Sequence, residues 1–365
     1  MKLIINGDFL AKPKTGMGQY LLQILEHQKW DYEIIILIPE YLKSSVKHIP
    51  QSIQKQIQYI PTWYTRNDLI AQILWEKTVF PKAVLRLKAD IVWSPHSSLS
   101  YIPQIPHIMT VHDVIYWRLP EYIPNWKVGI YVKLLKKSIL RANKIITVSQ
   151  FSAQEIENIF NIPAKSISVI YNSSSKLAVK HSDFEEQEKY IFYEGGLDIR
   201  KNVPQLIEAF AIIVPKYPNL CLYIAGNYFE SSLIPNIPAL IAQYNLEDRV
   251  KLLGYISDED MVKYIQGAEI LVYPSLYEGF GIPIIEGWSL GTPVITSNIG
   301  AMKEVGGDAA VLINPNSAKS IAKGIQSILQ DDLLRQSLIY KGYERAQEFD
   351  WNISARQLGE ILDNQ

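Results

Sequence analysis

The chain of 365 residues contains a single cysteine, Cys221, and no hydrophobic run long enough to cross a membrane as a helix. One cysteine excludes a disulfide framework, so we expect a reducing compartment such as the cytoplasm. Cys221 lies in an apolar strand pattern, Leu220–Ile224, which indicates a buried thiol and not a reactive one. The first residues form a short apolar run without a cleavage-site pattern, so we expect a first strand there and not a signal peptide.

The three-glycine fingerprint of dinucleotide-binding proteins is also missing. Gly16 and Gly18 form a lone Gly-x-Gly step, and this step lies well past the first expected strand. An NAD-dependent oxidoreductase is therefore disfavoured. We expect the two glycines in a loop that leads into a helix starting near Tyr20.

The chain does contain a repeated alternation of apolar strands and helical segments. Hydrophobic residues make up 48% and charged residues 20% of the composition, as in globular proteins with a large core, and the length suits two domains. The expected strands, five in each half, are Lys2–Asn6, Tyr32–Ile38, Ile91–Ser94, His107–Val111, Lys144–Val148, Tyr190–Tyr193, Cys221–Ala225, Val250–Leu253, Ile270–Tyr273 and Val294–Thr296. This pattern predicts two α/β domains with parallel sheets, residues 1–175 and 176–350, joined by a polar linker over Ser173–Lys189.

Charge is divided unevenly between these halves, although the formal net charge is only −1. Residues 1–175 carry 20 basic and 12 acidic side chains, whereas the remainder carries 16 basic and 25 acidic ones. Within the basic half, the spacing of Trp126–Lys144 predicts an amphipathic helix with a lysine-rich face. Such a helix can lie on an anionic membrane or bind an anionic acceptor, or it can be a core-packed helix with solvated lysines. Both interpretations stay open, and we expect no nucleic-acid partner.

The most informative segment is Tyr273–Ile295, which contains two carboxylates, Glu278 and Glu286, separated by seven residues. It begins as a buried strand, continues with the step Gly279-Phe280-Gly281, and enters a helix that Pro283 can open and Gly291 can end. Such a strand–loop–helix corner is where open α/β sheets bind ligands. Its glycines let backbone N–H groups approach an anion, and a carboxylate accepts two hydrogen bonds from a vicinal diol. We expect Glu278 in the loop and Glu286 near the first helical turn.

A second segment, Tyr193–Asn202, also leaves a strand and enters a helix. Arg200 and Lys201 stand at the expected helix start, where the helix dipole disfavours cations. A bound diphosphate would resolve this conflict, so the two side chains are candidate phosphate ligands.

Together these segments resemble the retaining, nucleotide-sugar-dependent glycosyltransferases of family 4, and the resemblance extends from about Val92 to the C-terminus. It implies the GT-B fold, in which two Rossmann-like domains face each other across a cleft, with residues 351–365 returning to the first domain. It also implies that Glu278 faces the donor sugar, that Glu286 holds the ribose, and that Arg200 and Lys201 neutralise the diphosphate. Many members carry a further arginine where this chain has Gly196. Because this chain lacks that arginine, neutralisation of the diphosphate is expected to depend on Arg200 and Lys201.

The resemblance gives roles to the N-terminal half as well. Gly16 and Gly18 match a glycine-rich loop near the donor phosphates and the acceptor. His112, at the end of an expected strand, matches a His-Asp step whose histidine forms hydrogen bonds to the donor sugar. His96 and Ser149 also stand at strand ends and are weaker candidates.

Some glycosyltransferases stabilise the leaving diphosphate with a metal ion held by an Asp-x-Asp pair. The segment Ser257–Asp260 instead indicates a helix N-cap with an acidic first turn, so we expect no metal. Ile256 and Asp258 lie where the family presents groups to the nucleobase, and an acidic group there favours guanine. The expected donor is therefore GDP-mannose, with a UDP-sugar second. The expected acceptor is a growing polysaccharide or a lipid-linked saccharide, and contact with the inner face of the membrane is compatible with both.

The resemblance implies retention of anomeric configuration. No carboxylate can be assigned as a covalent nucleophile, so we expect departure and attack on one face of the sugar, with Glu278 offsetting the positive charge of the ring. Two other classes stay open. A sugar-nucleotide epimerase of the same fold would not need the Glu278 and Glu286 pair, and a non-catalytic sugar-nucleotide-binding relative is compatible with Gly196.

Overall fold

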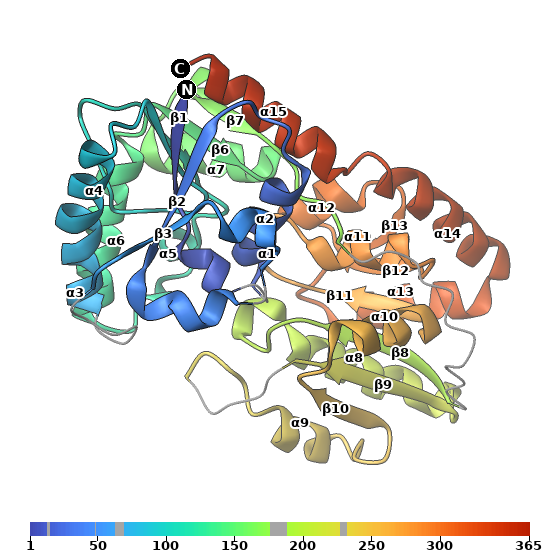
Figure 1. The fold of residues 1–365 in the computed structure, drawn as a ribbon. Coiled ribbons are helices and arrows are strands. Elements are labelled where there is room, and N and C mark those ends of the chain that lie inside the picture. The colour runs from blue at the N-terminus through green and yellow to red at the C-terminus, as the bar shows by residue number, and fades with distance from the viewer. Residues whose placement is uncertain (13–14, 48, 63–68, 176–187, 227–231) are drawn as a thin grey trace. The chain divides into compact units, whose positions relative to one another are not determined.

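Two parallel β-sheets organise the chain, one in each of two units (Figure 1). The computed structural model describes residues 1–12, 15–47, 49–62, 69–175, 188–226 and 232–365. Unit 1 comprises Met1–Asn172 together with Asp350–Gln365, and unit 2 comprises Ser173–Phe349. Most of the expected linker, residues 176–187, lies outside the described residues.

The sheet of unit 1 has seven strands, and all its described neighbours are parallel. Its strands, in spatial order, are β3 (Ile57–Ile60), β2 (Glu33–Pro39), β1 (Lys2–Asn6), β4 (Ile91–Ser94), β5 (His107–Thr110), β6 (Lys144–Thr147) and β7 (Ile167–Val169). The order reverses direction between β1 and β4, which is the topological switch point of this sheet.

The sheet of unit 2 has six strands and the same parallel design. Its strands, in spatial order, are β10 (Val250–Gly254), β9 (Leu220–Ala225), β8 (Lys189–Glu194), β11 (Ile270–Tyr273), β12 (Val294–Ser297) and β13 (Ala310–Ile313). Here the switch point lies between β8 and β11. All ten strands expected from the sequence are present to within one or two residues at each end, while β3, β7 and β13 were not predicted.

Helices cover both faces of the unit 1 sheet, because the side chains of a buried parallel strand alternate between two cores. Leu3 and Ile5 of β1 join the core under α1, whereas Ile4 joins the core under α4. The helices of this unit are α1 (Gly16–His27), α2 (Gln51–Gln54), α3 (Leu69–Leu74), α4 (Phe80–Arg86), α5 (Ile115–Arg118), α6 (Trp126–Ile139), α7 (Gln150–Phe160) and α15 (Trp351–Asp363), with a π-helical turn η3 (Trp75–Val79) and the short 3₁₀ turns η1 (Asp8–Ala11), η2 (Glu40–Val46), η4 (Pro120–Tyr122) and η5 (Ala164–Ser166).

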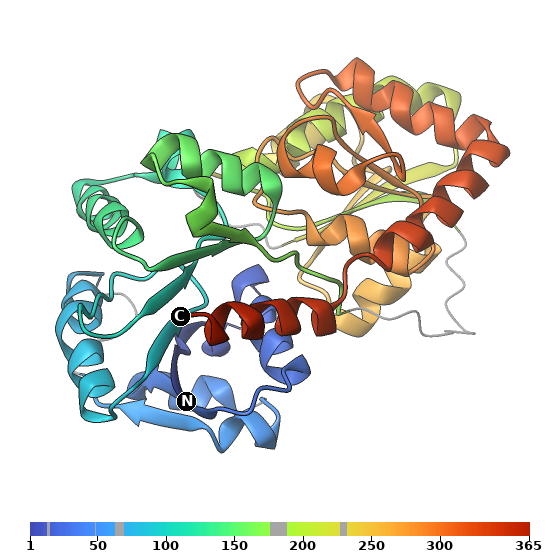
Figure 2. The same ribbon diagram turned by 90° about the horizontal axis from the view of Figure 1, so that it is seen from above.

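The last helix, α15, packs against α1 beside the N-terminal strand, as Figure 2 shows. Its buried side chains Trp351, Leu358 and Leu362 are part of the unit 1 core. The indole N–H of Trp30 donates a hydrogen bond of 3.0 Å to the carbonyl of Ala355. Helix α15 thus completes the core to which β1 and α1 contribute.

Unit 2 has the same layered construction. Its helices are α8 (Val203–Ile213), α9 (Ile237–Gln243), α10 (Asp258–Gly267), α11 (Ile282–Ser289), α12 (Gly300–Gly306), α13 (Ala318–Gln330) and α14 (Asp332–Ala346), with the short turns η6 (Ile199–Lys201) and η7 (Val214–Lys216). Pro283 lies in the first turn of α11, and Gly291 follows its end with φ +79°, as expected from the sequence. Cys221 is buried in β9, also as expected.

Two helix predictions need correction. Gly16 and Gly18 do not form a loop before a helix, because α1 already begins at Gly16 and Thr15 caps it by accepting a hydrogen bond from the Gly18 amide. The helix expected over Trp126–Lys144 ends at Ile139. It ends there because Asn143 hydrogen-bonds through its backbone and its side chain to His107 of β5, which draws the following residues into β6. Among the described residues, no helix is both long enough and apolar enough to cross a bilayer.

Candidate active site

The switch point of the unit 2 sheet brings together two chain segments that are far apart in sequence. The segment after β8 contains Arg200 and Lys201, and the segment after β11 contains Glu278. Because β8 and β11 are parallel neighbours, both segments leave the sheet at the same carboxyl edge.

A tight turn holds the two cations in place. Arg200 and Lys201 belong to the single 3₁₀ turn η6, and Asn202 follows it in the left-handed conformation with φ 62°. The side-chain amide of Asn202 donates hydrogen bonds to the carbonyls of Pro274 and Pro315, at 3.1 and 2.7 Å. The cations therefore precede helix α8 in a turn that is tied directly to the β11 segment.

The carboxylate of Glu278 forms ion pairs with both cations. Its Oε2 lies 2.6 Å from Nη1 of Arg200, and its Oε1 lies 2.7 Å from Nζ of Lys201. Nε of Arg200 also lies 3.1 Å from Oδ1 of Asp198. Glu278 and Lys201 are each only 8% exposed, so this is an ion cluster inside the protein and not a surface pair.

The electrostatics of the cluster keep the carboxylate charged. Burial by itself favours the neutral form of Glu278, but the positive charges of Lys201 and Arg200 outweigh it and lower the pKa of Glu278 to about 2. Burial lowers the pKa of Lys201, and Glu278 opposes that shift. Glu278 is therefore ionised at neutral pH, and the charge of each partner opposes the effect of burial on the other.

Tyr273 is a member of the cluster that was not predicted from the sequence. Its buried hydroxyl donates to Oε1 of Glu278 at 3.0 Å and accepts from Nζ of Lys201 at 2.7 Å. The ring of Tyr193 stacks on it from the neighbouring strand. The signal in the sequence was a hydroxyl-bearing residue at the last position of an otherwise aliphatic strand, ILVY. A buried tyrosine hydroxyl needs a polar partner, and the carboxyl end of a central strand supplies one.

The remaining predicted residues of this segment lie on the turn and helix that follow. Gly281 has φ +121°, a conformation that an L-residue rarely adopts, and it directly precedes α11, which no side chain caps. Glu286 is buried and is the fifth residue of α11, just past the first helical turn and close to the expected place. Gly279 and Phe280 complete the loop, and the Phe280 ring packs edge-on against Phe349.

Three further predicted residues lie at the same edge of the sheet or close to it. Gly196 is exposed, and its carbonyl accepts a hydrogen bond from the Tyr193 hydroxyl. Ile256 and Asp258 follow β10 at the end of the sheet order, and Asp258 is exposed in the first turn of α10. Ser257 caps that helix by accepting from the Asp260 amide, which confirms the predicted N-cap.

In unit 1 the predicted residues follow different strands. Gly18 lies where an added Cβ would come within 2.0 Å of the Lys12 carbonyl, so close backbone packing explains this glycine. Gly16 is exposed in the same first turn. His112 follows β5, and its Nε2 lies 2.9 Å from the Pro95 carbonyl. Burial lowers the pKa of His112 to about 4, so the ring is neutral at pH 7, with Nε2 donating and Nδ1 left as an acceptor.

A second polar group of unit 1 lies at its own switch point. Nε2 of His96, after β4, lies 3.4 Å from Oδ1 of Asp8, after β1. Glu76, from η3, accepts hydrogen bonds from the Leu99 amide and the Ser98 hydroxyl. His96 was a weak prediction, while Asp8 and Glu76 were not predicted. Another weak candidate, Ser149, caps α7 by accepting from the Ser152 amide.

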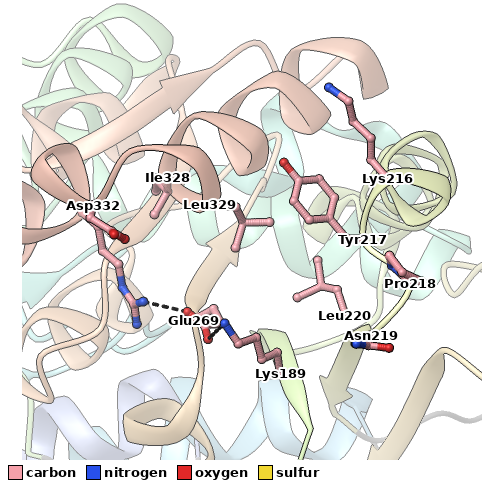
Figure 3. Close-up of a pocket in the computed structure, with 11 residues that line it drawn as sticks. Lys189, Lys216, Tyr217, Pro218, Asn219, Leu220, Glu269, Ile328, Leu329 and Asp332 are labelled. Carbon is pink, nitrogen blue, oxygen red and sulfur yellow. Dashed lines mark ion pairs between the residues drawn. The ribbon is translucent and has the colours of Figure 1, made fainter.

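A surface pocket of unit 2 lies elsewhere (Figure 3). Lys189 and Leu220, which line it, begin β8 and β9, and Glu269 directly precedes β11. The pocket therefore lies at the amino ends of these strands, on the opposite edge from Glu278. Glu269 pairs with Lys189 at 3.8 Å and with Arg335 at 2.8 Å, so two of the basic side chains of this pocket share one carboxylate.

Comparison with known families agrees with this geometry. Residues 175–345 match the family described as Glycosyl transferases group 1, and residues 15–173 match Glycosyltransferase Family 4. Together the two matches cover nearly all of the chain.

Individual proteins give the same result. The O-antigen chain mannosyltransferase B of Escherichia coli is 30% identical over 376 residues, which is 96% of each chain. The O-antigen chain mannosyltransferase RfbU of Salmonella typhimurium is 29% identical and covers 90% of this chain and 91% of its own. The crystal structure of Anabaena Alr3699/HepE in complex with UDP and glucose superimposes with a TM-score of 0.78 over the whole of both chains, at 20% sequence identity. These matches confirm the resemblance found in the sequence: the chain belongs to the group 1, family 4 glycosyltransferases and is a glycosyltransferase with the GT-B fold.

Proposed function

We propose that this glycosyltransferase moves a mannosyl group from GDP-mannose to a hydroxyl of a growing polysaccharide or a lipid-linked saccharide, with retention of anomeric configuration. Two relatives that align over nine tenths of the chain or more are named O-antigen mannosyltransferases, which supports mannose as the sugar and a polysaccharide as the product. The observation that carries the proposal is the buried cluster of Arg200, Lys201 and Glu278 at the switch point of unit 2.

The cluster suits a donor that presents a diphosphate next to a sugar. Arg200 and Lys201 are the groups for the diphosphate, whose charge grows as the bond to the sugar breaks. Glu278 pairs with both cations. A diphosphate that competes for them frees the Glu278 carboxylate to accept hydrogen bonds from sugar hydroxyls and to offset positive charge on the ring. Donor binding is thus an exchange of anions around two fixed cations.

The other site residues take roles around this exchange. Glu286, buried on α11, holds the ribose, and the Gly279–Gly281 turn with the uncapped start of α11 offers backbone N–H groups to the phosphates. His112, held neutral by burial, accepts a hydrogen bond from a sugar hydroxyl at Nδ1. Gly16 and Gly18, in the first turn of α1, are assigned to the donor phosphates and the acceptor.

We propose that the reaction needs no metal ion, because Lys201 and Arg200 supply the two positive charges that a diphosphate requires. The acidic run Asp258–Asp260 belongs to the capped start of α10, and Lys263 pairs with Glu259 and Asp260. Ile256 and Asp258 are assigned to the nucleobase, with Asp258 accepting from the guanine edge. A UDP-sugar is the second candidate donor, since the structurally similar Anabaena protein was crystallised with UDP and glucose.

Thermal unfolding with GDP, UDP, dTDP and ADP, each with and without EDTA, tests the proposal. A ligand at about 100 times its dissociation constant should stabilise the protein by roughly 2–3 kcal/mol. We expect GDP to give the largest shift, EDTA to leave it unchanged, and Lys201→Ala to abolish it. Lys341→Ala is the matched control, because Lys341 also pairs with a carboxylate, Asp308, but on the surface of unit 2.

The outcomes separate the alternatives. A shift with UDP alone reassigns the donor base, and a shift that EDTA removes overturns the metal-free mechanism. No shift with any nucleotide contradicts the proposed donor site. Release of mannose-labelled product from GDP-mannose then distinguishes a transferase from a non-catalytic binder and from an epimerase, because neither of these extends an acceptor.

A further inference from the structure

Two neighbouring helical segments of unit 1 expose large apolar side chains to solvent. The first runs through α3, η3 and α4 as far as residue 88. The second is α6 with the residues that follow it as far as 144, and α6 contacts α3. Their exposed apolar residues have 45% to 65% of their surface accessible, and these are Ile70, Leu74, Leu85, Trp126, Ile130 and Leu140. Figure 1 shows α3, α4 and α6 along one side of unit 1.

The exposed face of α6 is a regular helical stripe and not an accidental gap in packing. Residues 126, 130, 133, 137 and 140 recur every three or four positions, so they share one face. The buried residues Val132, Leu135 and Ile139 lie on the opposite face and pack into the domain. The helix therefore has a complete core face, and the outward face is available for another partner.

Basic side chains surround these apolar groups. The exposed cations of the two segments are Lys77, Lys82, Arg86, Lys88, Lys127, Lys133, Lys136, Lys137 and Arg141. Residues 126–144 contain no acidic side chain, and Glu76, buried at 3% exposure, is the sole acid of residues 69–88. We call these exposed apolar and basic side chains together the basic–apolar face.

We propose that the basic–apolar face binds the surface of an anionic phospholipid bilayer. Tryptophan, isoleucine and leucine side chains can enter the region between headgroups and acyl chains, while lysine and arginine contact the phosphates around them. A soluble polyanion such as a nucleic acid would use the cations but gives no reason for six exposed apolar side chains. A second copy of the same face is disfavoured, because nine like charges would meet nine others.

The proposed contact is peripheral. Helix α6 has 14 residues, fewer than the about 20 that a membrane-spanning helix needs, and its inner face is already part of the unit 1 core. The inference concerns unit 1 and does not depend on which sugar nucleotide unit 2 binds. It does favour a lipid-linked saccharide as the acceptor, because an enzyme held at a lipid surface meets lipid-linked saccharides at a high local concentration.

Co-sedimentation of the full chain with vesicles tests the inference. The probes are phosphatidylcholine vesicles and vesicles in which about a third of the lipid is phosphatidylglycerol. We expect binding to the anionic vesicles only, and a loss of at least tenfold in bound fraction between about 0.05 and 0.5 M salt, because salt screens exposed charges.

Two double variants separate the contributions. Lys133→Glu with Lys137→Glu reverses two charges on the outer stripe, and Trp126→Ser with Ile130→Ser removes its apolar groups. Each pair should weaken vesicle binding about tenfold or more while leaving nucleotide binding unchanged. The matched control is Lys319→Glu with Lys323→Glu, two exposed lysines at the same spacing on α13 of unit 2. Melting temperatures check that each variant folds.

Binding to neither kind of vesicle, or an equal loss in the α13 control, overturns the proposal. If the lysine pair weakens binding and the Trp126 and Ile130 pair does not, the surface recognises a polyanion by charge alone, and the assignment to a bilayer is wrong. Failure of these tests leaves the donor site of unit 2 unaffected, and failure of the nucleotide tests leaves the basic–apolar face unaffected.

Discussion

Each of the two units has a parallel sheet with a switch point and covering helices, yet the units differ in where their charged side chains lie. Unit 1 has its cations on outer helical faces, as in the Lys133 and Lys137 stripe of α6. In unit 2, Lys201 is buried and Arg200 is partly buried, and both pair with the buried Glu278. Exposed charge attracts a large anionic partner from a distance and is screened by salt, whereas buried charge orients a small ligand and is screened far less.

The interiors differ in the same sense. Unit 1 buries His96 and His107 and largely covers His112, and burial lowers the pKa of each to about 4, so these rings are neutral. Unit 2 buries a carboxylate, Glu278, that stays charged beside Lys201. One architecture therefore accommodates a neutral polar interior and an ionic one, and the choice depends on whether a compensating charge is built beside each group.

The largest expected effect comes from removing the negative charge of the unit 2 cluster. In Glu278→Gln, Arg200 and Lys201 lose the anion that competes with a diphosphate. We expect turnover to fall about 100-fold or more, since the group that stabilises the reacting sugar is lost. Binding of GDP, however, should become tighter by up to about tenfold, which corresponds to about 1.4 kcal/mol. Titration calorimetry and initial rates on the same preparation measure both quantities.

The control for this variant is Glu188→Gln, which also removes a carboxylate paired with a lysine, Lys251, but at an exposed position. It should change neither quantity. Weaker GDP binding in Glu278→Gln would contradict the exchange of anions and would mean that Glu278 holds the cations in their productive geometry instead.

The two units should unfold at different acidic pH values. The three histidines have folded pKa values near 4, below the usual 6.5, so the unfolded chain binds more protons between these values and stability falls as pH drops through that window. Glu76, whose pKa burial raises, offsets part of this loss. Glu278 has a folded pKa near 2, so its contribution to the stability of unit 2 is lost only as the pH falls from about 4.5 to 2. Unit 1 should therefore open first.

Hydrogen exchange measured between pH 7 and 4 checks this order, because it reports on peptides of each unit separately. Amides of β4, β5 and β6 should lose protection before those of β8 and β11. Replacement of His107 by asparagine should shift the unit 1 transition to lower pH, since one of the three buried rings is gone. Earlier loss of protection in β8 would overturn the assignment of acid sensitivity to the histidines.

The smallest expected effect concerns the tyrosine that links the unit 2 pair. Tyr273→Phe keeps the ring, which stacks with Tyr193, and removes only the hydroxyl between Lys201 and Glu278. A hydrogen bond to a charged group is worth about 1.5–3 kcal/mol, so we expect roughly a tenfold fall in kcat with little change in KM. The pH at which activity falls on the alkaline side should also decrease, because Lys201 loses a polar neighbour. A change in KM alone, with an unaltered pH profile, would assign the hydroxyl a merely structural role.

Much of the fold could be predicted from the sequence, and the strands that could not have something in common. The strands β3, β7 and β13 lie at sheet edges, each with a single neighbour. A central strand such as Ile270–Tyr273 is buried on both faces and has a continuous apolar run. An edge strand such as Ile57–Ile60 includes the exposed Gln58, and its extended backbone is decided by the neighbour with which it pairs.

The site shows a similar limit. Arg200, Lys201 and Glu278 were predicted because glycine-rich turns and a cation at a helix start are local features of the sequence. Tyr273 was missed because its ring fits an apolar strand pattern, and its hydroxyl gains meaning only when β8 lies beside β11. Asp8 and Glu76 were missed for the same reason, since η3 must first fold over the ends of β1 and β4.

The packing of α15 also bears on how the protein folds during synthesis. Trp351 and Leu358 belong to the unit 1 core, but the ribosome makes them after the whole of unit 2. Ser173 donates to the carbonyl of Phe349, so the two chain segments that bound unit 2 are hydrogen-bonded to each other. Unit 2 is thus an insertion within unit 1 and can fold while the chain is still growing. Until α15 has been made, nascent unit 1 lacks this part of its core, and we expect the apolar side chains of α1 to need a chaperone during that interval.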